Sequence, residues 1–164
     1  MSGTGKSTLT AVLAARGYTA VDLDTGEWSE WVPIPGGVPC DAPVEGASVW
    51  RNRDWVWRED RVAHLLATED ADILFVSGTA SNQGKFYQQF DHIILLSAPT
   101  SVLVERLSSR TTNSYGKDPS ELARVLQHVE TVEPLLRRAA TLEVDTNVAL
   151  DRVLETVLDA VRGV

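Results

Sequence analysis

Along this chain of 164 residues, segments with apolar residues at helical spacing alternate with short continuous apolar runs. Apolar residues recur at helical spacing in four segments: residues 7–16, 100–107, 122–129 and 150–161. Short apolar, often β-branched runs lie between them and predict strands: residues 19–23, 73–77, 92–96 and 141–145. Because strands and helices alternate, the pattern predicts an α/β fold with a parallel sheet and right-handed crossovers.

Two segments break this alternation. Residues 25–49 are rich in proline and glycine, which predicts an irregular excursion, and an apolar stripe over residues 54–66 predicts a helix after it.

Two positions mark the boundaries of a later helix. Asp118 and Pro119 form a strong helix start, and Pro134 is expected to interrupt or kink that helix. At this length we expect a single domain.

The first eight residues carry the most specific motif, Met-Ser-Gly-Thr-Gly-Lys-Ser-Thr. It reads as the end of a phosphate-binding loop of the form G-x-x-x-x-G-K-[ST], in which backbone N–H groups surround a nucleotide's phosphates. In such a loop Lys6 reaches the β and γ oxygens and Ser7 meets Mg²⁺. A helix follows at once, so its positive end faces the phosphates. The predicted nucleotide-binding residues here are Gly3, Thr4, Gly5, Lys6, Ser7 and Thr8.

Two carboxylates follow the strand predicted at residues 19–23. Open α/β sheets bind ligands beyond the carboxyl ends of their strands, where Asp22 and Asp24 are expected to lie. They are candidates for holding Mg²⁺ through water or for accepting a proton from an attacking hydroxyl. The alternative is that one or both cap the next turn.

The excursion and the helix predicted after it hold all five tryptophans together with several arginines, Arg53 and Arg58 among them. Indole rings can form walls for planar or sugar-like ligands, and guanidinium groups bind carboxylate or phosphate. This mixture suits an acceptor pocket over about residues 25–66. The alternative is that the tryptophans form a small core that holds the excursion together.

Further candidates lie later in the chain. Gly78 follows the strand predicted at residues 73–77, where a glycine lets backbone approach a ligand or simply forms a turn. Arg106 and Arg110 lie four residues apart on one helix face, before a polar segment that we interpret as a lid at about residues 110–119. They are candidates for stabilising charge during phosphoryl transfer, or else surface charges, Arg106 pairing with Glu105 or Glu121.

Composition narrows the function classes. A net charge of −8 and a pI near 4.8 argue against binding to nucleic acid or to an anionic membrane. Cys40 is the single cysteine, which excludes an intramolecular disulfide and fits a reducing compartment. The sequence shows no run long enough to span a membrane and no signal peptide, so we expect a cytoplasmic protein. The three histidines have no ligand-like spacing.

Together these motifs resemble the branch of P-loop kinases that contains nucleoside monophosphate kinases and shikimate kinases. The resemblance covers almost the whole chain and implies a three-layer P-loop fold with a lid, binding ATP and Mg²⁺. By resemblance Asp22 serves Mg²⁺, Asp24 serves the acceptor hydroxyl, and Arg58 grips the acceptor's carboxylate. The Glu-Arg-Leu-x-x-Arg segment is similar to adenylate kinases and implies that Arg106 and Arg110 flank ATP. The turn containing Asn147 resembles the one that backs adenine.

The sequence also departs from those relatives. Shikimate kinases carry a triple glycine after the third strand, whereas this chain has only Gly78 there. The tryptophan-rich excursion matches neither parent pattern. The sequence therefore does not name the acceptor, and the choice between ATP and GTP, the pathway and the oligomeric state also stay open.

The largest departure is that the strand leading into the phosphate loop in this fold is missing from the sequence. That strand is central, so without it the strands near residues 73 and 92 lack the partner between them. Unpaired buried backbone groups cost roughly 1 to 3 kcal/mol each, against a total stability of about 5 to 15 kcal/mol. We therefore expect the natural chain to start upstream with an apolar strand and the first loop glycine, Met1 being internal.

The sequence thus predicts an ATP-dependent phosphotransferase that acts on a small hydroxyl compound or a nucleoside monophosphate. An acceptor hydroxyl needs a base such as Asp24, whereas a nucleoside monophosphate needs several arginines around its phosphate. The alternative is an ATP-binding switch or sensor with little kinase activity, whose excursion contacts a protein partner.

Overall fold

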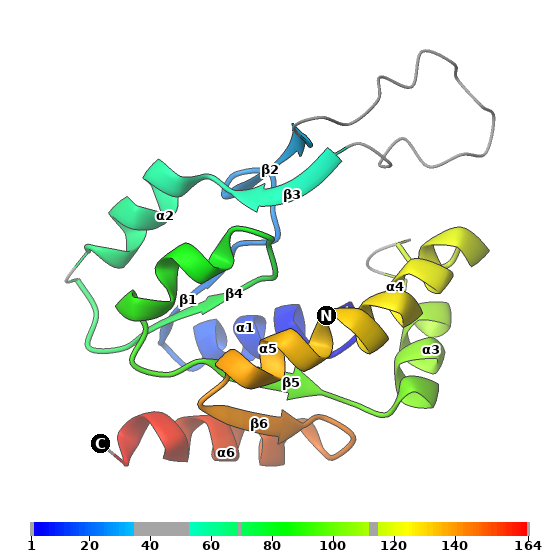
Figure 1. The fold of residues 1–164 in the computed structure, drawn as a ribbon. Helices are drawn as coiled ribbons and strands as arrows, with labels where there is room; N and C mark the ends of the chain where they lie inside the picture. Colours follow the sequence, from blue (N-terminus) through cyan, green and yellow to red (C-terminus); the bar gives the residue numbers. More distant parts are fainter. Residues whose placement is uncertain (1, 35–52, 69, 112–114, 164) are drawn as a thin grey trace.

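The computed structural model describes residues 2–34, 53–68, 70–111 and 115–163, and all structural statements below concern them (Figure 1). Its elements in chain order are α1 (Lys6–Ala15), β1 (Thr19–Asp22), β2 (Ser29–Pro33), β3 (Arg53–Trp57), α2 (Glu59–Leu66), β4 (Leu74–Ser77), the 3₁₀ helix η1 (Gln83–Gln89), β5 (Ile94–Ser97), α3 (Thr100–Ser109), α4 (Pro119–Thr131), α5 (Glu133–Ala139), β6 (Leu142–Asp145) and α6 (Leu150–Arg162). The fold is α/β with parallel strands, as the alternating pattern predicts. No helix in these ranges is long and apolar enough to cross a membrane.

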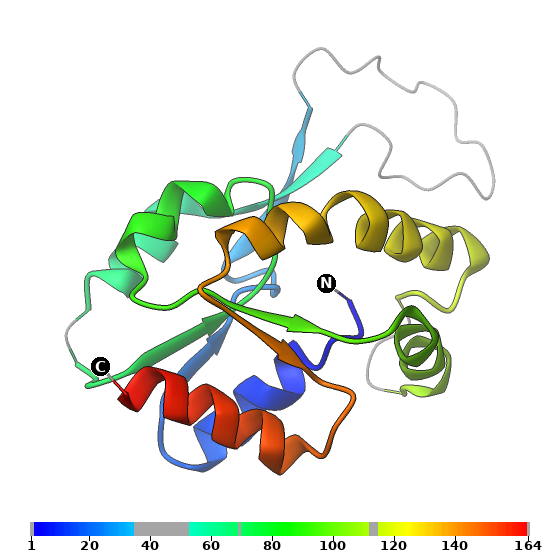
Figure 2. The same ribbon diagram turned by 60° about the horizontal axis from the view of Figure 1, so that its bottom comes forward.

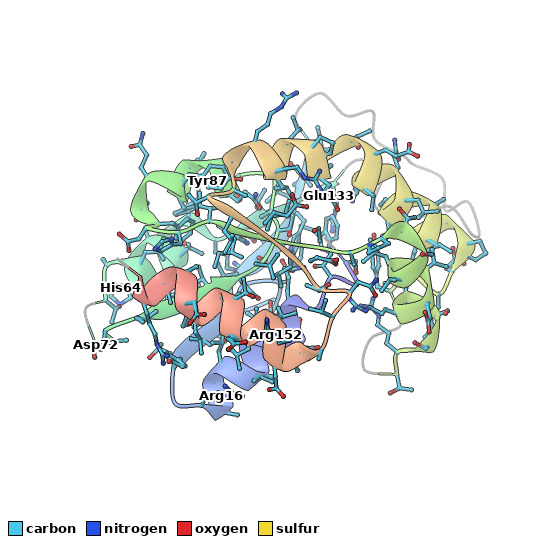
Figure 3. The ribbon with its side chains drawn as sticks, turned by 90° about the horizontal axis from the view of Figure 1, so that it is seen from below. Arg16, His64, Asp72, Tyr87, Glu133 and Arg152 are labelled. Carbon is cyan, nitrogen blue, oxygen red and sulfur yellow. The ribbon has the colours of Figure 1, made fainter. Side chains whose placement is uncertain are left out.

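Parallel strands form two separate pairs. β1 pairs with β4, with Val21 opposite Val76, and β5 pairs with β6, with Leu96 opposite Val144. Helices α1 and α6 lie on one side of these strands, while α5 and η1 lie on the other (Figure 2). A view from below agrees, with Arg16 and Arg152 toward one side and Tyr87 and Glu133 toward the other (Figure 3).

The main core lies between the strands and the helices α1 and α6. Its members are apolar side chains at most 8% exposed: Leu9, Leu13, Leu96, Val144, Val153, Leu154, Val157 and Leu158. α6 supplies four of them, at the helical spacing seen in the sequence. Burying side chains of this size contributes about 1.5 to 3 kcal/mol each, so this cluster fixes α1 against the strand pairs.

A cavity of about 540 Å³ separates the two strand pairs. Among the described strands β4 has no neighbour except β1, and β5 has none except β6. The sequence pattern predicts residues 73–77 as a buried strand, but Leu74, Phe75, Val76 and Ser77 are only half-buried because one edge of β4 faces this cavity. Within the described residues, the parallel strands therefore form two pairs that are not joined into one continuous sheet.

Two predictions for the excursion are wrong. Residues 29–33 form strand β2, and residues 53–57 form strand β3 where a helix is predicted, paired antiparallel with Trp31 opposite Trp55. Aromatic and β-branched residues at 55–57 favour a strand, and the helix begins only at Glu59, where two acidic residues occupy its first turn. Residues 35–52, including Cys40 and Trp50, lie outside the described residues.

Helix ends agree better with the sequence. Gly17 adopts φ of 89°, as expected of the residue that follows a helix. Asp118 caps α4 by accepting a hydrogen bond from Ser120 N at 2.8 Å. The predicted interruption near Pro134 is also present, because α4 ends at Thr131 and α5 begins at Glu133.

A charged cluster links α5 to the edge strand β6. Arg137 Nε and Nη2 donate to Glu143 at 2.7 and 2.8 Å, and Nη2 also donates to Glu133 at 2.8 Å. The hydrogen bonds from Arg137, with a further one from Ser97, lower the pKa of the Glu143 carboxyl to about 2. A carboxyl whose pKa falls on folding stabilises the fold only while it is ionised.

The Arg137–Glu143 pair therefore predicts a pH-dependent stability. Replacing Glu143 with Gln should lower the free energy of unfolding at pH 7 by roughly 0.5 to 1 kcal/mol, because the pair is solvent-exposed. The difference should shrink as pH falls below about 4.5, where the unfolded-state carboxyl becomes protonated, toward pH 2. Urea unfolding between pH 7 and pH 3 measures it, with Glu155→Gln, from a pair within α6, as the matched control. An effect that stays constant over this range would contradict the assignment.

Candidate phosphate and acceptor site

The phosphate loop has the backbone geometry that its glycines predict. Gly3 and Gly5 have φ of 83° and 91°, a region that other residues rarely adopt, and Gly5 is the N-cap of α1. Thr4 between them is 1% exposed, which fixes the loop against the core. The first turn of α1 contains no acidic residue, so no side chain there cancels the positive end of the helix dipole. This loop presents its N-terminal amides to an anion.

Two loop side chains meet the two carboxylates at the end of β1. Ser7 Oγ donates to Asp22 Oδ2 at 2.6 Å, and Lys6 Nζ lies 3.3 Å from Asp24 Oδ2. Asp22 also accepts from the backbone N–H of Asp24 through its other oxygen, at 3.0 Å. The structure thus brings the loop side chains Lys6 and Ser7 together with Asp22 and Asp24. Asp22 does cap the turn as the alternative holds, and it contacts the loop at the same time.

The tip of β4 completes this group from a third direction. Thr79 N donates to Asp24 Oδ1 at 2.8 Å, so both oxygens of that carboxylate are oriented. Ser77 lies beside α1, where its hydroxyl accepts from Thr10 at 3.0 Å. Gly78 is packed closely: a Cβ added there would come within 3.1 Å of Leu23 and of Trp57 Nε1 and within 3.2 Å of Asp24. The close approach predicted for this glycine is therefore a contact with the site's own side chains.

On the far side of Gly78, the hairpin β2–β3 contributes Trp57 and Arg58. Trp57 is 5% exposed and belongs to a second apolar core with Leu23, Val62, Ala80 and Phe86. Asn82 holds its backbone, accepting from Trp57 N at 2.8 Å and donating to Trp57 O at 2.9 Å. The interpretation of the tryptophans as a small core thus holds for Trp57, although its indole Nε1 is buried without a hydrogen-bond partner.

Arg58 is half-buried beside this core. Its Nη1 lies 3.3 Å from Glu30 Oε2, and its Nε is buried without a hydrogen-bond partner. Its backbone N–H donates to Trp28 O at 2.7 Å, which fixes the start of α2 against the hairpin. Arg53 lies at the other end of β3, about 13 Å from Trp57 at the usual rise per residue. The structure therefore places Arg58 directly after Trp57, in contact with Glu30, and leaves Arg53 at the opposite end of the strand.

Arg106 ties the phosphate loop to the end of β6. Its Nη1 donates to Gly3 O at 3.3 Å and to Thr146 Oγ1 at 2.9 Å, while Nη2 donates to Thr146 O at 2.7 Å. Thr146 Oγ1 in turn donates to Ser97 O at 3.0 Å. The alternative of a surface pair with Glu105 or Glu121 is therefore wrong. In this arrangement Arg106 fixes the phosphate loop to the turn after β6 through Gly3 and Thr146.

The segment predicted as a lid is fixed at both described ends. Arg110 Nη2 donates to Tyr115 O, and Gly116 N donates to Glu121 Oε2 at 2.8 Å. Gly116 has φ of 89° and lies against Leu107, where an added Cβ would come within 3.1 Å. Burial lowers the pKa of the Arg110 guanidinium from its usual value, and Arg110 Nε has no hydrogen-bond partner. Residues 112–114 lie outside the described residues.

Two other predicted nucleotide contacts sit at the rim. Asn147 is exposed in the turn after β6, where its N–H donates to Asp145 at 2.8 Å, one residue from the Thr146 that Arg106 holds. Thr8 is exposed in the first turn of α1. Both positions therefore border the loop without taking part in the carboxylate group.

The donor set at Ser7 and Asp22 fits Mg²⁺. This ion prefers oxygen ligands and is usually held by one or two carboxylates together with substrate phosphates and water. A hydroxyl and a carboxylate oxygen 2.6 Å apart beside a phosphate loop are such a set. In the described part of the chain no cluster of three or more His, Cys, Asp or Glu side chains forms a metal site by itself.

Sequence reasoning missed four residues that organise the site. Thr10, Thr79, Asn82 and Thr146 each make a side-chain or backbone hydrogen bond that holds a predicted site residue or its strand. Thr10 and Thr79 were detectable as polar residues beside predicted site elements. Asn82 contacts Trp57, 25 residues away, and Thr146 contacts Arg106, 40 residues away, so no local sequence pattern predicts these contacts.

The chain matches a known protein-family model. A family model described as an AAA domain, AAA_18, matches residues 1–127, which include the phosphate loop, both carboxylates, the hairpin and the arginine-bearing helix α3. No curated protein matches the chain. The match covers more than half of the chain.

The packing around Gly78 yields a prediction. Gly78→Ala places a methyl group against Leu23, Trp57 and Asp24 at once, so it should lower the free energy of unfolding by about 1 to 3 kcal/mol. Gly84→Ala is the matched control, because open space surrounds that position, and it should change stability by less than about 0.5 kcal/mol. Urea unfolding followed by tryptophan fluorescence measures both. Equal effects of the two substitutions would show that Gly78 is not a close-packed position.

Proposed function

The chain belongs to the AAA_18 family of AAA domains, which have nucleotide-binding P-loops, and we propose that it transfers the γ-phosphoryl group of ATP to a small acceptor. The family match supports nucleotide binding through Gly3 to Thr8. The proposal of phosphotransfer rests on the groups that surround this loop, above all on Asp24.

One observation carries the proposal: each carboxylate at the end of β1 meets a different side chain of the phosphate loop. Asp22 meets Ser7 at 2.6 Å and Asp24 meets Lys6 at 3.3 Å. Nucleotide binding with Mg²⁺ uses the first pair. The second carboxylate lies where a γ-phosphate oxygen would compete for the Lys6 ammonium, and an ATP-binding switch has no use for a negative charge there.

Phosphoryl transfer needs positioning and charge neutralisation more than covalent chemistry from the protein. In the proposed mechanism the loop amides and Lys6 hold the β and γ phosphates, while Ser7 and Asp22 hold Mg²⁺, which when bound neutralises charge on the phosphate oxygens. Asp24 Oδ2 exchanges its Lys6 contact for the acceptor hydroxyl and accepts its proton as the hydroxyl oxygen attacks. Thr79 N keeps the other carboxylate oxygen fixed during that exchange.

Arginines support the two ends of the reaction in different ways. Arg106 holds Gly3 and Thr146, so it positions the loop and the turn proposed to back the base. Arg110, beside the proposed lid, is the candidate that reaches the transferring phosphoryl group. Arg58 is proposed to bind an anionic group of the acceptor, and this requires its exchange away from Glu30.

The arginine distribution favours a hydroxyl acceptor over a nucleoside monophosphate. Recognition of an acceptor phosphate takes several arginines, and the two predicted for this role lie apart, Arg53 at the start of β3 and Arg58 after its end. A carboxylate-bearing hydroxyl compound needs one such arginine and a base, which matches Arg58 and Asp24. The proposed acceptor class is therefore a small hydroxy acid.

The proposal is tested by ADP release from Mg·ATP across a panel of hydroxy acids, sugars, sugar acids and nucleoside monophosphates. One acceptor class should raise turnover well above the background of the Lys6→Ala variant, and hydroxy acids are expected to do so. Turnover with a nucleoside monophosphate alone would keep phosphotransfer and overturn the hydroxyl assignment. ATP binding without acceleration by any acceptor would contradict phosphotransfer and favour the switch function.

The separate tasks of the two carboxylates give a sharper prediction for Asp24. Asp24→Asn should retain ATP binding within a few-fold, because it removes a competitor for Lys6, and should lower the rate of transfer to a hydroxyl by about 10²- to 10⁴-fold, the usual range for a general base. ATP titration and ADP release on the same preparation measure both. Asp60→Asn, an exposed carboxylate on α2, is the matched control and should change neither. Full activity in Asp24→Asn would remove Asp24 from the mechanism.

A further inference from the structure

The indole N–H of Trp57 is a buried hydrogen-bond donor beside the base proposed above. The Trp57 side chain belongs to a residue that is 5% exposed, and its Nε1 has no hydrogen-bond partner among the described residues. Buried donors are nearly always paired, because leaving one unpaired costs free energy. The unpaired indole N–H therefore needs a partner that another state of the protein supplies.

The position of this donor is set by the fold. Asn82 binds both the N–H and the C=O group of the Trp57 backbone, at 2.8 and 2.9 Å, so β3 ends beside the segment that follows β4 (Figure 1). The indole ring packs against Phe86, with the ring centroids 5.7 Å apart, inside the second apolar core. Because side chains in a close-packed core occupy defined rotamers, Nε1 keeps its direction.

Gly78 leaves the way between this donor and Asp24 open. The point that a Cβ of residue 78 would occupy lies 3.1 Å from Trp57 Nε1 and 3.2 Å from Asp24 Oδ1. The indole nitrogen and the carboxylate oxygen therefore approach Gly78 from the same side. A methyl group at this point would stand between the two atoms, and glycine avoids that obstruction.

The Asp24 carboxylate has the capacity to accept the indole hydrogen. Its Oδ1 accepts a hydrogen bond from Thr79 N at 2.8 Å, and its Oδ2 lies 3.3 Å from Lys6 Nζ. An ionised carboxylate offers about four lone-pair sites over its two oxygens, so Oδ1 can accept a second donor. The attraction of Lys6 for Oδ2 holds the carboxylate in its present orientation. Loss of that attraction leaves the carboxylate free to turn toward Trp57.

We propose that Trp57 is a positioning residue for Asp24, whose indole N–H donates to Asp24 Oδ1 once a phosphate has drawn Lys6 away from Oδ2. This inference rests on the proposed function, in which Asp24 is the base. The new hydrogen bond replaces the lost contact with Lys6 and leaves Oδ2 to accept the proton of the acceptor hydroxyl. Hydrogen bonds to an ionised group are among the stronger ones. The donor that is unpaired without nucleotide is thus paired in the state that transfers the phosphoryl group.

NMR of the indole groups tests this hydrogen bond without nucleotide or acceptor. Isotope labelling gives one indole N–H signal for each of the five tryptophans, and Trp57→Phe identifies the signal of Trp57. Lys6→Met removes the ammonium group from Asp24, so the Trp57 indole proton should move downfield, as protons do on entering a hydrogen bond. The move should be absent when Lys6→Met is combined with Asp24→Ala. The signal of Trp55, on the same strand, is the matched control and should stay in place.

Three results of this experiment would overturn the proposal. The first is a Trp57 signal that does not move in Lys6→Met while the Trp55 signal shows an intact hairpin. The second is an equal move in the protein that also carries Asp24→Ala, because the indole would then have a different partner. The third concerns the unchanged protein with the magnesium complex of the β,γ-imido analogue of ATP. Its γ-phosphate should draw Lys6 away and move the Trp57 signal downfield, and a bound analogue that leaves the signal in place contradicts the exchange.

Transfer kinetics give a second readout. Trp57→Phe should lower the rate of transfer about 10- to 100-fold, the usual worth of a hydrogen bond to a charged group, and should retain ATP binding. It should cause little further loss in the Asp24→Asn background, because the indole acts through that carboxylate. Losses that multiply in the double variant would overturn the positioning role. Absence of transfer in the unchanged protein would contradict the proposed function, whereas the NMR comparison of the Lys6→Met proteins would still stand, so the two failures are distinguishable.

Discussion

The contact between the end of β1 and the start of α1 is the constraint on which the site depends. Ser7 and Lys6 stand in the first turn of a helix whose N-cap glycine has φ of 91°, and Asp22 and Asp24 stand at the tip of the neighbouring strand. Charge-assisted hydrogen bonds of this kind are stronger than neutral ones, and they place two carboxylates next to a loop that binds anions. Without nucleotide, Lys6 and Ser7 contact the two carboxylates. A bound phosphate would compete with Asp24 for the Lys6 ammonium.

Packing from three other elements holds that contact in place. Gly78 fits between Asp24 and Trp57 because it has no side chain. The Asn82 side chain fixes Trp57 by accepting a hydrogen bond from its backbone N–H and donating one to its backbone C=O. Arg106 connects Gly3 with Thr146 across the other side of the loop. The hairpin and β4 therefore support Asp24, whereas α3 and the end of β6 support the phosphate loop.

The sequence predicts the local parts of this account well. Helical spacing, the glycine at position 17 and the Asp118-Pro119 cap locate most helices, and the phosphate loop identifies where the nucleotide binds. Prediction fails at residues 53–57, where the tryptophan and valine side chains suit both a helical stripe and a strand, and only pairing with β2 decides between them. The sequence also does not reveal the contact of Arg106 with Thr146, because it joins positions 40 residues apart.

The central claim is a division of labour, with Asp22 serving the metal and Asp24 serving transfer. The most direct measurement is the affinity for ATP with and without Mg²⁺ in the unchanged protein, in Asp22→Asn and in Asp24→Asn. The account predicts that Mg²⁺ strengthens ATP binding in the unchanged protein and in Asp24→Asn, and that this gain is largely lost in Asp22→Asn. Loss of the Mg²⁺ dependence to the same degree in both variants would contradict the account.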